Sequence, residues 1–280
     1  MRSKNTCLVC GEASAPLFEN LVLGRYPVAY FQCQSCGLVQ TEHPYWLDEA
    51  YGAAISSLDV GMVGRNIFLS HKAAQTIAAV FDPGARFLDY AGGYGLFVRM
   101  MRDKGFDFYR QDRYCSNIFA QHLDLKDLEP HARFELVTAF EVFEHLVDPV
   151  AEVRQLFDYA DSVLFSTVLV PEGEPLQKDW WYLVPETGQH IVFFTVRALE
   201  LLAQQLGCRF FSNHADLHLL TRRDIADPFA EKKKPISVRV AEKYLRWAMP
   251  SDLQGKSLLA QDFEAARQRA SQRAAPSERR

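Results

Sequence analysis

The chain has 280 residues, which is enough for one large domain with a small one, or for two modest domains. Hydrophobic residues make up 48% and charged residues 24%, as is ordinary for a soluble globular enzyme. A net charge of -4 gives no electrostatic case for binding nucleic acid or an anionic membrane. No apolar run is long enough to cross a bilayer and no apolar signal core follows Met1, so we expect a cytoplasmic protein.

Two turns of the form Cys-x-x-Cys-Gly open the chain, within residues 1–43. The first holds Cys7, Cys10 and Gly11, and the second holds Cys33, Cys36 and Gly37. Two intervening residues let both thiolates of a turn face one ion, and the glycine lets the backbone bend. Four thiolates form a tetrahedral set that suits zinc and leave no open position for a substrate. We therefore expect a structural zinc in a small ribbon, with redox pairs or unrelated buried thiols as alternatives.

A helical connector and then a strand and helix alternation follow. Residues 44–81 have a helical pattern, with an amphipathic helix over His71–Val80 that ends at Asp82-Pro83-Gly84. Within residues 82–225 the pattern predicts strands and helices in turn: strands at 86–90, 106–111, 134–140 and 162–167, helices at 96–101, 150–159 and 195–206. Runs at 208–212 and 216–221 predict a closing hairpin. This order indicates an α/β fold with a mostly parallel sheet, helices on both faces and an antiparallel edge.

Residues 226–280 differ in composition from the rest. The run Lys232-Lys233-Lys234-Pro235 is interpreted as a solvated linker, and a helix is expected over Val240–Met249. Beyond Gln261 the chain is rich in Ala, Arg, Gln and Glu, which predicts a solvated helix or a disordered tail.

The first expected strand of the alternation ends in a turn of small residues. Its sequence from Asp89 to Gly95 is Asp-Tyr-Ala-Gly-Gly-Tyr-Gly, and a helix follows. Small residues let the backbone approach a ligand closely at the positive end of a helix. The glycine spacing does not match the dinucleotide fingerprint, which disfavours a nicotinamide oxidoreductase. About 20 residues further on, Asp112 ends the second strand, where an acid can hydrogen-bond ribose hydroxyls.

A third segment carries acidic and histidine residues after the strand at 134–140. It contains Glu141, then Glu144-His145 and Asp148-Pro149. Together with the Asp89–Gly95 turn and Asp112, this segment resembles the ordered motifs of class I S-adenosylmethionine-dependent methyltransferases, with Ala91 in place of the first glycine. The resemblance spans residues 87–149. It implies a Rossmann-like, mostly parallel sheet of seven strands and a cofactor site at Asp89, Tyr90, Ala91, Gly92, Gly93, Gly95, Asp112 and Glu141.

Two parts of this predicted site stay open. The region 114–133 is shorter than in the family, so the residue that meets the adenine is not identified, although Asp124 and Asp127 are candidates. Glu144 and His145 are expected near the mouth of the site, where either a structural or a catalytic role suits them.

The predicted substrate side follows the strand at 162–167. Three consecutive aromatic residues, Trp180, Trp181 and Tyr182, lie in a Pro-rich loop. They are expected either to wall a pocket or to pack against the cysteine module. His190 precedes an apolar run, so it should begin an element near the site. A histidine, with an ordinary pKa of about 6.5, can take a proton from an acceptor hydroxyl or amine.

The cysteine module, the aromatic loop and the His190-Ile-Val-Phe-Phe-Thr run resemble the sugar C-methyltransferases of deoxysugar biosynthesis. That group has a Glu-His pair before the aromatic run, whereas this chain has Gln189-His190. Because Gln cannot act as a base, we expect the wider function. This is methyl transfer from S-adenosylmethionine to a small-molecule acceptor, such as a sugar or nucleotide sugar, by in-line displacement with His190 or His145 as the base.

Two other classes of function compete with this prediction. An RNA or protein methyltransferase would use the cysteine module as a reader and would need a basic stripe, for which Lys232-Lys233-Lys234 and the Arg-rich tail are the candidates. A non-catalytic scaffold would explain Ala91 and the short region 114–133. We expect a small-molecule acceptor and neither nucleic acid nor membrane as partner, and the oligomeric state stays open.

Overall fold

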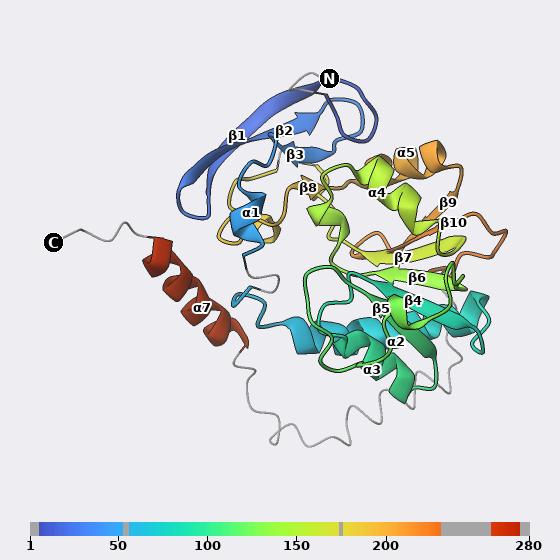
Figure 1. The fold of residues 1–280 in the computed structure, drawn as a ribbon. Coiled ribbons are helices and arrows are strands. Elements are labelled where there is room, and N and C mark those ends of the chain that lie inside the picture. The colour runs from blue at the N-terminus through green and yellow to red at the C-terminus, as the bar shows by residue number, and fades with distance from the viewer. Residues whose placement is uncertain (1–5, 53–55, 174–175, 231–258, 275–280) are drawn as a thin grey trace, which may run out of the picture.

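The structure is a computed structural model that describes residues 6–52, 56–173, 176–230 and 259–274 (Figure 1). Within these residues, a six-stranded sheet and a four-stranded sheet lie one above the other. The lysine run at 232–234 and the helix expected over 240–249 lie outside the described residues. In the described part of the chain, no helix has both the length and the apolar character needed to cross a membrane.

The large sheet is mostly parallel, as the alternation predicts. Its strands are β4 (Arg86–Tyr90), β5 (Asp107–Gln111), β6 (Leu136–Ala139), β7 (Ser162–Ser166), β9 (Arg209–Ser212) and β10 (Leu217–Thr221). The spatial order is β5-β4-β6-β7-β10-β9, with β4 to β7 parallel. Strand β10 runs antiparallel to both β7 and β9, so the predicted closing hairpin is confirmed.

This sheet has six strands in the described residues, and not the seven that the family resemblance implies. Beside β5, where another strand would pair, the chain makes a single parallel bridge between Arg110 and Asp124. It then turns into the short 3-10 helix η1 (Leu125–Asp127). The segment 114–133 is too short to supply both a covering helix and a full strand, so the sheet ends at β5.

Helices cover both faces of the large sheet because its strands alternate their apolar side chains between two cores. Helices α2 (Met62–Val80) and α3 (Leu96–Asp103) pack with Phe87 of β4 on one face. Helices α4 (Pro149–Leu156) and α5 (Val196–Leu206) pack with Leu88 on the other. The helices predicted at 71–80, 96–101, 150–159 and 195–206 are thus confirmed, and α2 starts well before the predicted His71.

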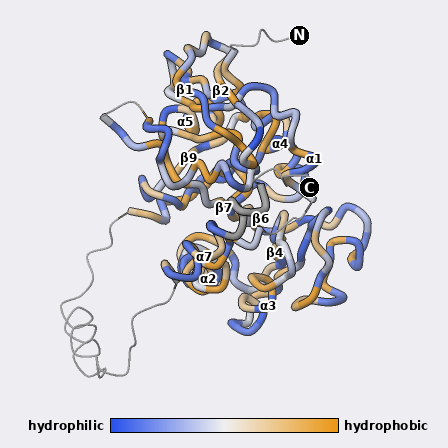
Figure 2. Tube along the Cα trace, turned by 90° about the vertical axis from the view of Figure 1, so that its left-hand side faces the viewer, coloured by the Kyte–Doolittle hydropathy of each residue, from blue (hydrophilic) through white to orange (hydrophobic). Residues whose placement is uncertain are grey.

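The N-terminal sheet is built from two distant parts of the chain. Strands β1 (Ser14–Val22), β2 (Tyr26–Cys33) and β3 (Val39–Thr41) are followed, in spatial order, by β8 (Val192–Phe193). All neighbouring pairs are antiparallel. Hydrophobic and hydrophilic residues mix along β1 and β2 (Figure 2), and Val22, Val28 and Tyr30 of these strands are buried in a small core. The element that follows His190 therefore belongs to this sheet and not to the large one.

A small core joins the N-terminal sheet to the loop that precedes β8. It contains Trp46, next to the short helix α1 (Leu47–Ala50), and Tyr182 of the 3-10 helix η3 (Trp181–Leu183). The indole Nε1 of Trp46 donates a hydrogen bond to the Gly188 carbonyl at 2.8 Å. The aromatic loop is thereby held on the side of the N-terminal sheet that faces the rest of the molecule.

The C-terminal helix α7 (Leu259–Ala274) lies apart from the large sheet, on the same side of the molecule as α1 (Figure 1). Its Arg267 Nε lies 2.7 Å from Glu186 Oε1, in the loop before β8. The sequence predicts a solvated helix or disorder here, and the helix is the outcome for 259–274. Phe263, a large apolar residue within this mostly polar segment, lines the central cleft.

Candidate functional site

A cleft of about 1800 Å³ lies between the two sheets, at the carboxyl ends of the parallel strands. It is bounded by the N-terminal sheet, α1, α2, the ends of β4 to β6, the loop before β8 and α7. Strand β5 lies on one side of β4, and the next strand in sequence, β6, lies on the other side. Open α/β sheets bind ligands at such a topological switch point. Of the predicted cofactor, substrate and catalytic residues, all line this cleft except Gly95 and Glu144.

The small-residue turn after β4 has no room for a side chain at Gly92. A Cβ at Gly92 would lie 2.5 Å from Asp89 Oδ2 and 2.9 Å from Arg110 Cγ. Asp89 Oδ1 accepts a hydrogen bond from Thr138 Oγ1 at 2.7 Å, and burial raises the Asp89 pKa to about 7. Ala91 has φ of +55°, a left-handed conformation that glycine adopts more readily. The turn is therefore a tight cradle built around a buried carboxyl group.

Arg110 supports this turn from beneath and was not singled out by its sequence. Its guanidinium is buried, with Nε 2.7 Å from Asp124 Oδ1 and NH2 donating to the Cys115 carbonyl at 3.0 Å. NH1 donates to the Gly93 carbonyl. Asp124 is thus an ion-pair partner, and it shares a capping box of η1 with Asp127, so the structure gives both adenine candidates other roles. The available signal was the buried position of Arg110 in the alternation of β5.

Asp112 links the turn to the loop after β5. Its Oδ2 accepts from the Gly93 amide at 2.9 Å. Its Oδ1 accepts from the Tyr114 and Cys115 amides at 2.7 Å each. A carboxylate oxygen can accept more than one hydrogen bond, so Asp112 can bind ribose hydroxyls while it keeps these contacts. Its place at the cleft matches the prediction for the second strand.

Glu141 follows β6 and is held in a left-handed conformation, with φ of +54°. Ser166 Oγ accepts from the Glu141 amide at 2.8 Å and donates to Glu141 Oε1 at 2.7 Å. Burial, and then the nearby charge of Glu144, raise the Glu141 pKa to about 7. Arg65 of α2 lies 3.6 Å from Glu141 Oε2 and also binds Asp59 at 2.8 Å. Sequence analysis missed Arg65 because an arginine in a helical pattern carries no distinguishing signal.

Glu144, His145 and His190 lie close together, and the two histidines line the cleft. The first two belong to the 3-10 helix η2 (Phe143–His145). The Ile191 amide donates to the Glu144 carbonyl at 2.9 Å, which brings the segment before β8 against η2. One carboxylate oxygen of Glu144 and one ring nitrogen of each histidine lie within 4.8 Å of one another. The three predicted catalytic residues are therefore one cluster.

Both histidine rings are oriented by backbone carbonyls. His145 Nδ1 lies 3.0 Å from the Gln189 carbonyl oxygen and 3.2 Å from Tyr51 Oη. His190 Nδ1 lies 2.7 Å from the Tyr182 carbonyl oxygen. Because a carbonyl oxygen only accepts hydrogen bonds, Nδ1 carries the proton in both rings. Each Nε2 therefore keeps its lone pair. Tyr51, which sequence analysis missed, lies in a segment without a motif.

The two histidines are neutral at physiological pH. Burial lowers the pKa of His145 to about 4, with a further contribution from His190. Burial also lowers the pKa of His190 to about 4. The rings meet edge to face, with centroids 4.9 Å apart. Two neutral imidazoles that line a cleft can accept a proton or bind an electrophilic ion.

The aromatic loop both packs and lines the cleft. Trp180 and Tyr182 contact Phe193 of β8, with ring centroids 5.7 Å and 6.3 Å apart. Trp181 is 69% exposed. All three line the cleft, so the pocket wall and the packing against the N-terminal sheet, which the sequence offers as alternatives, occur together.

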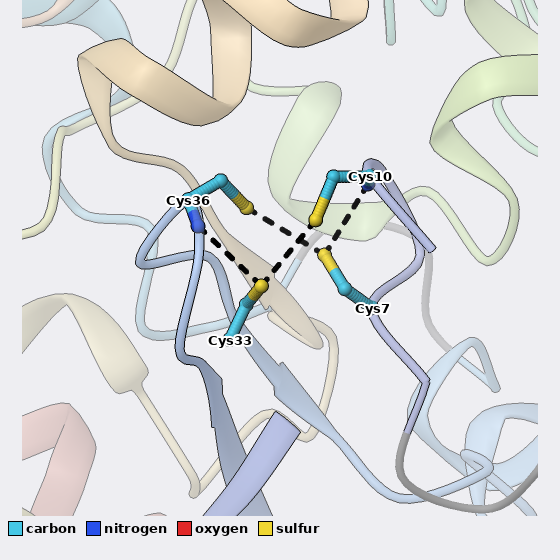
Figure 3. Close-up of side chains that lie close together, drawn as sticks. All are labelled: Cys7, Cys10, Cys33 and Cys36. Carbon is cyan, nitrogen blue, oxygen red and sulfur yellow. Dashed lines mark hydrogen bonds between the residues drawn. The ribbon is translucent and has the colours of Figure 1, made fainter. Parts of the chain in front are cut away.

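The four cysteines of the two N-terminal turns converge (Figure 3). Cys7 Sγ lies 3.6 Å from Cys36 Sγ, and Cys10 Sγ lies 3.4 Å from Cys33 Sγ. A tetrahedral zinc ion with bonds of about 2.3 Å places its sulfurs about 3.8 Å apart, so the thiols fit such an ion after small shifts. The amide of Cys10 points at Cys7 Sγ at 3.5 Å, and that of Cys36 at Cys33 Sγ at 3.5 Å.

This cysteine cluster lies against α5 and not at the cleft. Gln205 Nε2 of α5 donates to the Val9 carbonyl at 2.6 Å. Thr195, the N-cap of α5, donates from Oγ1 to the Cys36 carbonyl at 2.5 Å and accepts from the Ala198 amide at 3.0 Å. Four sulfurs facing one another inside this joint suit a structural ion.

The cradle at Gly92 yields a stability test. We expect Gly92→Ala to lower the free energy of unfolding by about 1–3 kcal/mol, because its Cβ overlaps a buried carboxyl group and the Arg110 side chain. Gly64→Ala, in α2, meets nothing within 4 Å and should not lower it. Urea unfolding of both variants measures the difference. Equal stability of Gly92→Ala and the wild type would show that the turn is not tightly packed.

A comparison of the chain with protein-family models gives one match. A family model described as a methyltransferase domain matches residues 65–213. No curated protein matches the chain. Solved structures that resemble it include CalO1, described as a methyltransferase in calicheamicin biosynthesis in an SAH-bound form (15% identity, TM-score 0.37, covering 55% of this chain and 54% of that one).

Two further structures are similar at this level. One is an O-methyltransferase family protein from Burkholderia thailandensis (11% identity, TM-score 0.42, covering 58% of this chain and 57% of that one). The other is human N-acetylserotonin methyltransferase in complex with SAM (11% identity, TM-score 0.39, covering 54% and 51%). The chain spans little more than half the length of each of these structures. The family model matches more than half of the 280 residues, and the chain therefore belongs to the methyltransferase domain family.

Proposed function

We propose that the protein transfers a methyl group from S-adenosylmethionine to a small-molecule acceptor in the cleft between the two sheets. One observation carries this proposal. A single cleft joins the small-residue turn and acidic strand ends, which suit the cofactor, to a pair of neutral histidines, which suit removal of a proton from the acceptor. The family match supports the same reaction class.

The residues around the turn after β4 fit the cofactor. The small residues Ala91, Gly92 and Gly93 line the cleft, so the adenosyl and methionine parts could approach the backbone there. Asp112 would hydrogen-bond the ribose, and Asp89 and Glu141 would flank the remainder. Bound S-adenosylmethionine supplies a methyl group on an electrophilic sulfonium. The chain's own residues then have to position the acceptor in line and take up one proton.

The acceptor would occupy the part of the cleft beside His145, His190 and the aromatic loop. A volume of about 1800 Å³ exceeds the roughly 300–1,000 Å³ of a usual small-molecule pocket, so the cleft has room for cofactor and acceptor together. Ring faces of Trp180 and Trp181 mixed with polar groups suit a partly hydroxylated molecule such as a sugar or nucleotide sugar. His190 is proposed as the base through Nε2, with His145 as the alternative.

We further propose that the cysteine cluster holds a structural zinc ion. The support is the convergence of four thiols with suitable spacing and their position against α5. Residues 1–43 would then act as a zinc module, residues 44–81 as a connector and residues 82–225 as the catalytic domain. Residues 226–280 would form the C-terminal segment.

Cofactor binding can be tested without knowing the acceptor. We expect S-adenosylmethionine to bind with a micromolar dissociation constant, and Asp112→Asn to weaken it at least about tenfold, equivalent to about 1.4 kcal/mol. Asp127→Asn, a carboxylate outside the cleft, should bind like the wild type. Isothermal titration calorimetry with S-adenosylmethionine and with NAD measures this. Binding of NAD alone, or none by a folded protein, would overturn the proposed cofactor.

The base assignment predicts a loss of turnover without a loss of cofactor. His190→Ala should lower the rate of S-adenosylhomocysteine formation about 10²- to 10⁴-fold, because general-base catalysis contributes that much. Its affinity for S-adenosylmethionine should stay within about twofold, since His190 is not part of the proposed cofactor cradle. His71→Ala, an exposed histidine of α2, is the matched control. The assay uses an acceptor found by screening hydroxylated small molecules. Normal turnover in His190→Ala would remove His190 from the mechanism.

The zinc proposal predicts a defined metal content. Cys33→Ser should lose one equivalent of zinc per chain and unfold more readily, because one of four thiolate ligands is missing. Cys115→Ser removes a cysteine outside the cluster and should keep the full metal content. Elemental analysis of the purified proteins by mass spectrometry gives the ratio. Equal zinc in Cys33→Ser and the wild type would exclude the cysteine site.

A further inference from the structure

The carboxylate of Glu144 is buried without the partners that such a group needs. Glu144 is 0% exposed, and neither Oε1 nor Oε2 has a hydrogen-bond partner within the described part of the chain. Leaving a buried carboxylate unsatisfied is costly, and buried acids in proteins are paired, protonated or bound to a metal. The buried carboxylate of Glu144 therefore needs a partner that the described residues do not supply. The nearby side chains indicate what that partner is.

Two histidine ring nitrogens lie beside this carboxylate. The ligand atoms of Glu144, His145 and His190 are all within 4.8 Å of one another. An ion with bonds of about 2.0–2.2 Å to nitrogen and oxygen draws tetrahedral ligands to about 3.3 Å from each other. The backbone hydrogen bond from Ile191 to Glu144 already holds the two segments together. Small side-chain rotations would therefore bring the ligand atoms to this shorter separation.

The surroundings of both rings are those of metal-binding histidines. A histidine that ligates a metal commonly donates its other ring N–H to a carbonyl or carboxylate, which fixes its orientation. His145 donates from Nδ1 to the Gln189 carbonyl, and His190 donates from Nδ1 to the Tyr182 carbonyl. Metal binding requires a neutral imidazole, and a ring whose Nδ1 carries the proton offers Nε2 as the ligand atom. Because both Nδ1 atoms are engaged by carbonyls, Nε2 is the ring nitrogen that a metal would take.

We propose that Glu144, His145 and His190 bind a divalent transition-metal cation at the acceptor end of the cleft. Two histidines and one carboxylate are a ligand set used for catalytic zinc and for non-haem iron. Three protein ligands leave at least one coordination position open. His145 and His190 line the cleft, so the open position faces the space proposed for the acceptor. This site is separate from the four-cysteine cluster and differs from it in ligand type.

The cation would change the role of the two histidines. Their Nε2 lone pairs would serve as ligands, and the open position would orient an oxygen or nitrogen atom of the acceptor. Loss of turnover in His190→Ala is expected for a base and for a ligand alike, so that measurement does not separate the two. Binding of the ion does separate them. The inference rests on the geometry of three side chains and holds whether or not methyl transfer is the reaction.

Cobalt(II) titration tests the site directly, on protein that a mild chelator has brought to one equivalent of zinc per chain, held by the cysteine cluster. We expect one added equivalent of Co²⁺ per chain, with visible d–d absorption and without the thiolate charge-transfer band that cobalt in the cysteine site would give. His145→Ala and His190→Ala should each weaken binding more than about 100-fold, since even changes to outer-shell partners cost about 10- to 100-fold. His71→Ala, an exposed histidine outside the cluster, should bind like the wild type.

Glu144→Gln gives a second readout that is independent of folding defects. Without Co²⁺, this variant should be at least as stable as the wild type, because it removes a buried unpaired carboxylate. With Co²⁺, only the wild type and His71→Ala should show a raised melting temperature. S-adenosylmethionine titration of each variant reports separately on the cofactor site. No added cobalt in the wild type, or equal cobalt binding in Glu144→Gln and both histidine variants, would overturn the proposal.

Discussion

One short backbone segment holds the two halves of the molecule in register. The Ile191 amide donates to the Glu144 carbonyl of the methyltransferase domain, and the Ile191 carbonyl accepts from the Thr41 amide of the N-terminal sheet, both at 2.9 Å. Strand β8 continues this contact by pairing with β3. His190 precedes this segment directly, so its position depends on both sheets at once. The cleft therefore exists only where the N-terminal sheet is docked.

The cysteine cluster strengthens the same joint from the other end of β3. Its second turn leads directly into β3, and Thr195 connects Cys36 to the start of α5. Cys7, Cys33 and Cys36 are buried, and they pack in the same core as α5. An ion at this position would act on the acceptor site through structure and not through chemistry.

Local motifs were sufficient to predict much of this architecture. The turn after β4, Asp112 at the end of β5 and the four cysteines each depend on residues close in sequence, and all lie where their patterns indicate. The parallel sheet and the closing hairpin follow from periodicity.

What the sequence did not reveal depends on contacts between distant segments. Strand β8 has two residues, too few to show a period, and its partner β3 is far away in sequence. Arg65 and Tyr51 reach the cleft from elements without a motif. The seventh strand that the family resemblance implies is absent from the described residues, because the segment 114–133 is short and makes only one bridge beside β5. A resemblance carried by motifs outside this segment does not reveal the shortening. The buried state of Glu144, and hence its missing partner, is visible only once three segments are placed together.

One cleft is proposed to hold the cofactor at the turn after β4 and the acceptor beside Glu144, His145 and His190. A crystal structure of the protein grown with S-adenosylhomocysteine tests it most directly. We expect the ribose at Asp112, the adenosyl group against Gly92 and Gly93, and the sulfur facing the part of the cleft that His145 and His190 line. A ligand bound elsewhere, or a sulfur that faces away from both histidines, would contradict the assignment of this cleft as the site of methyl transfer.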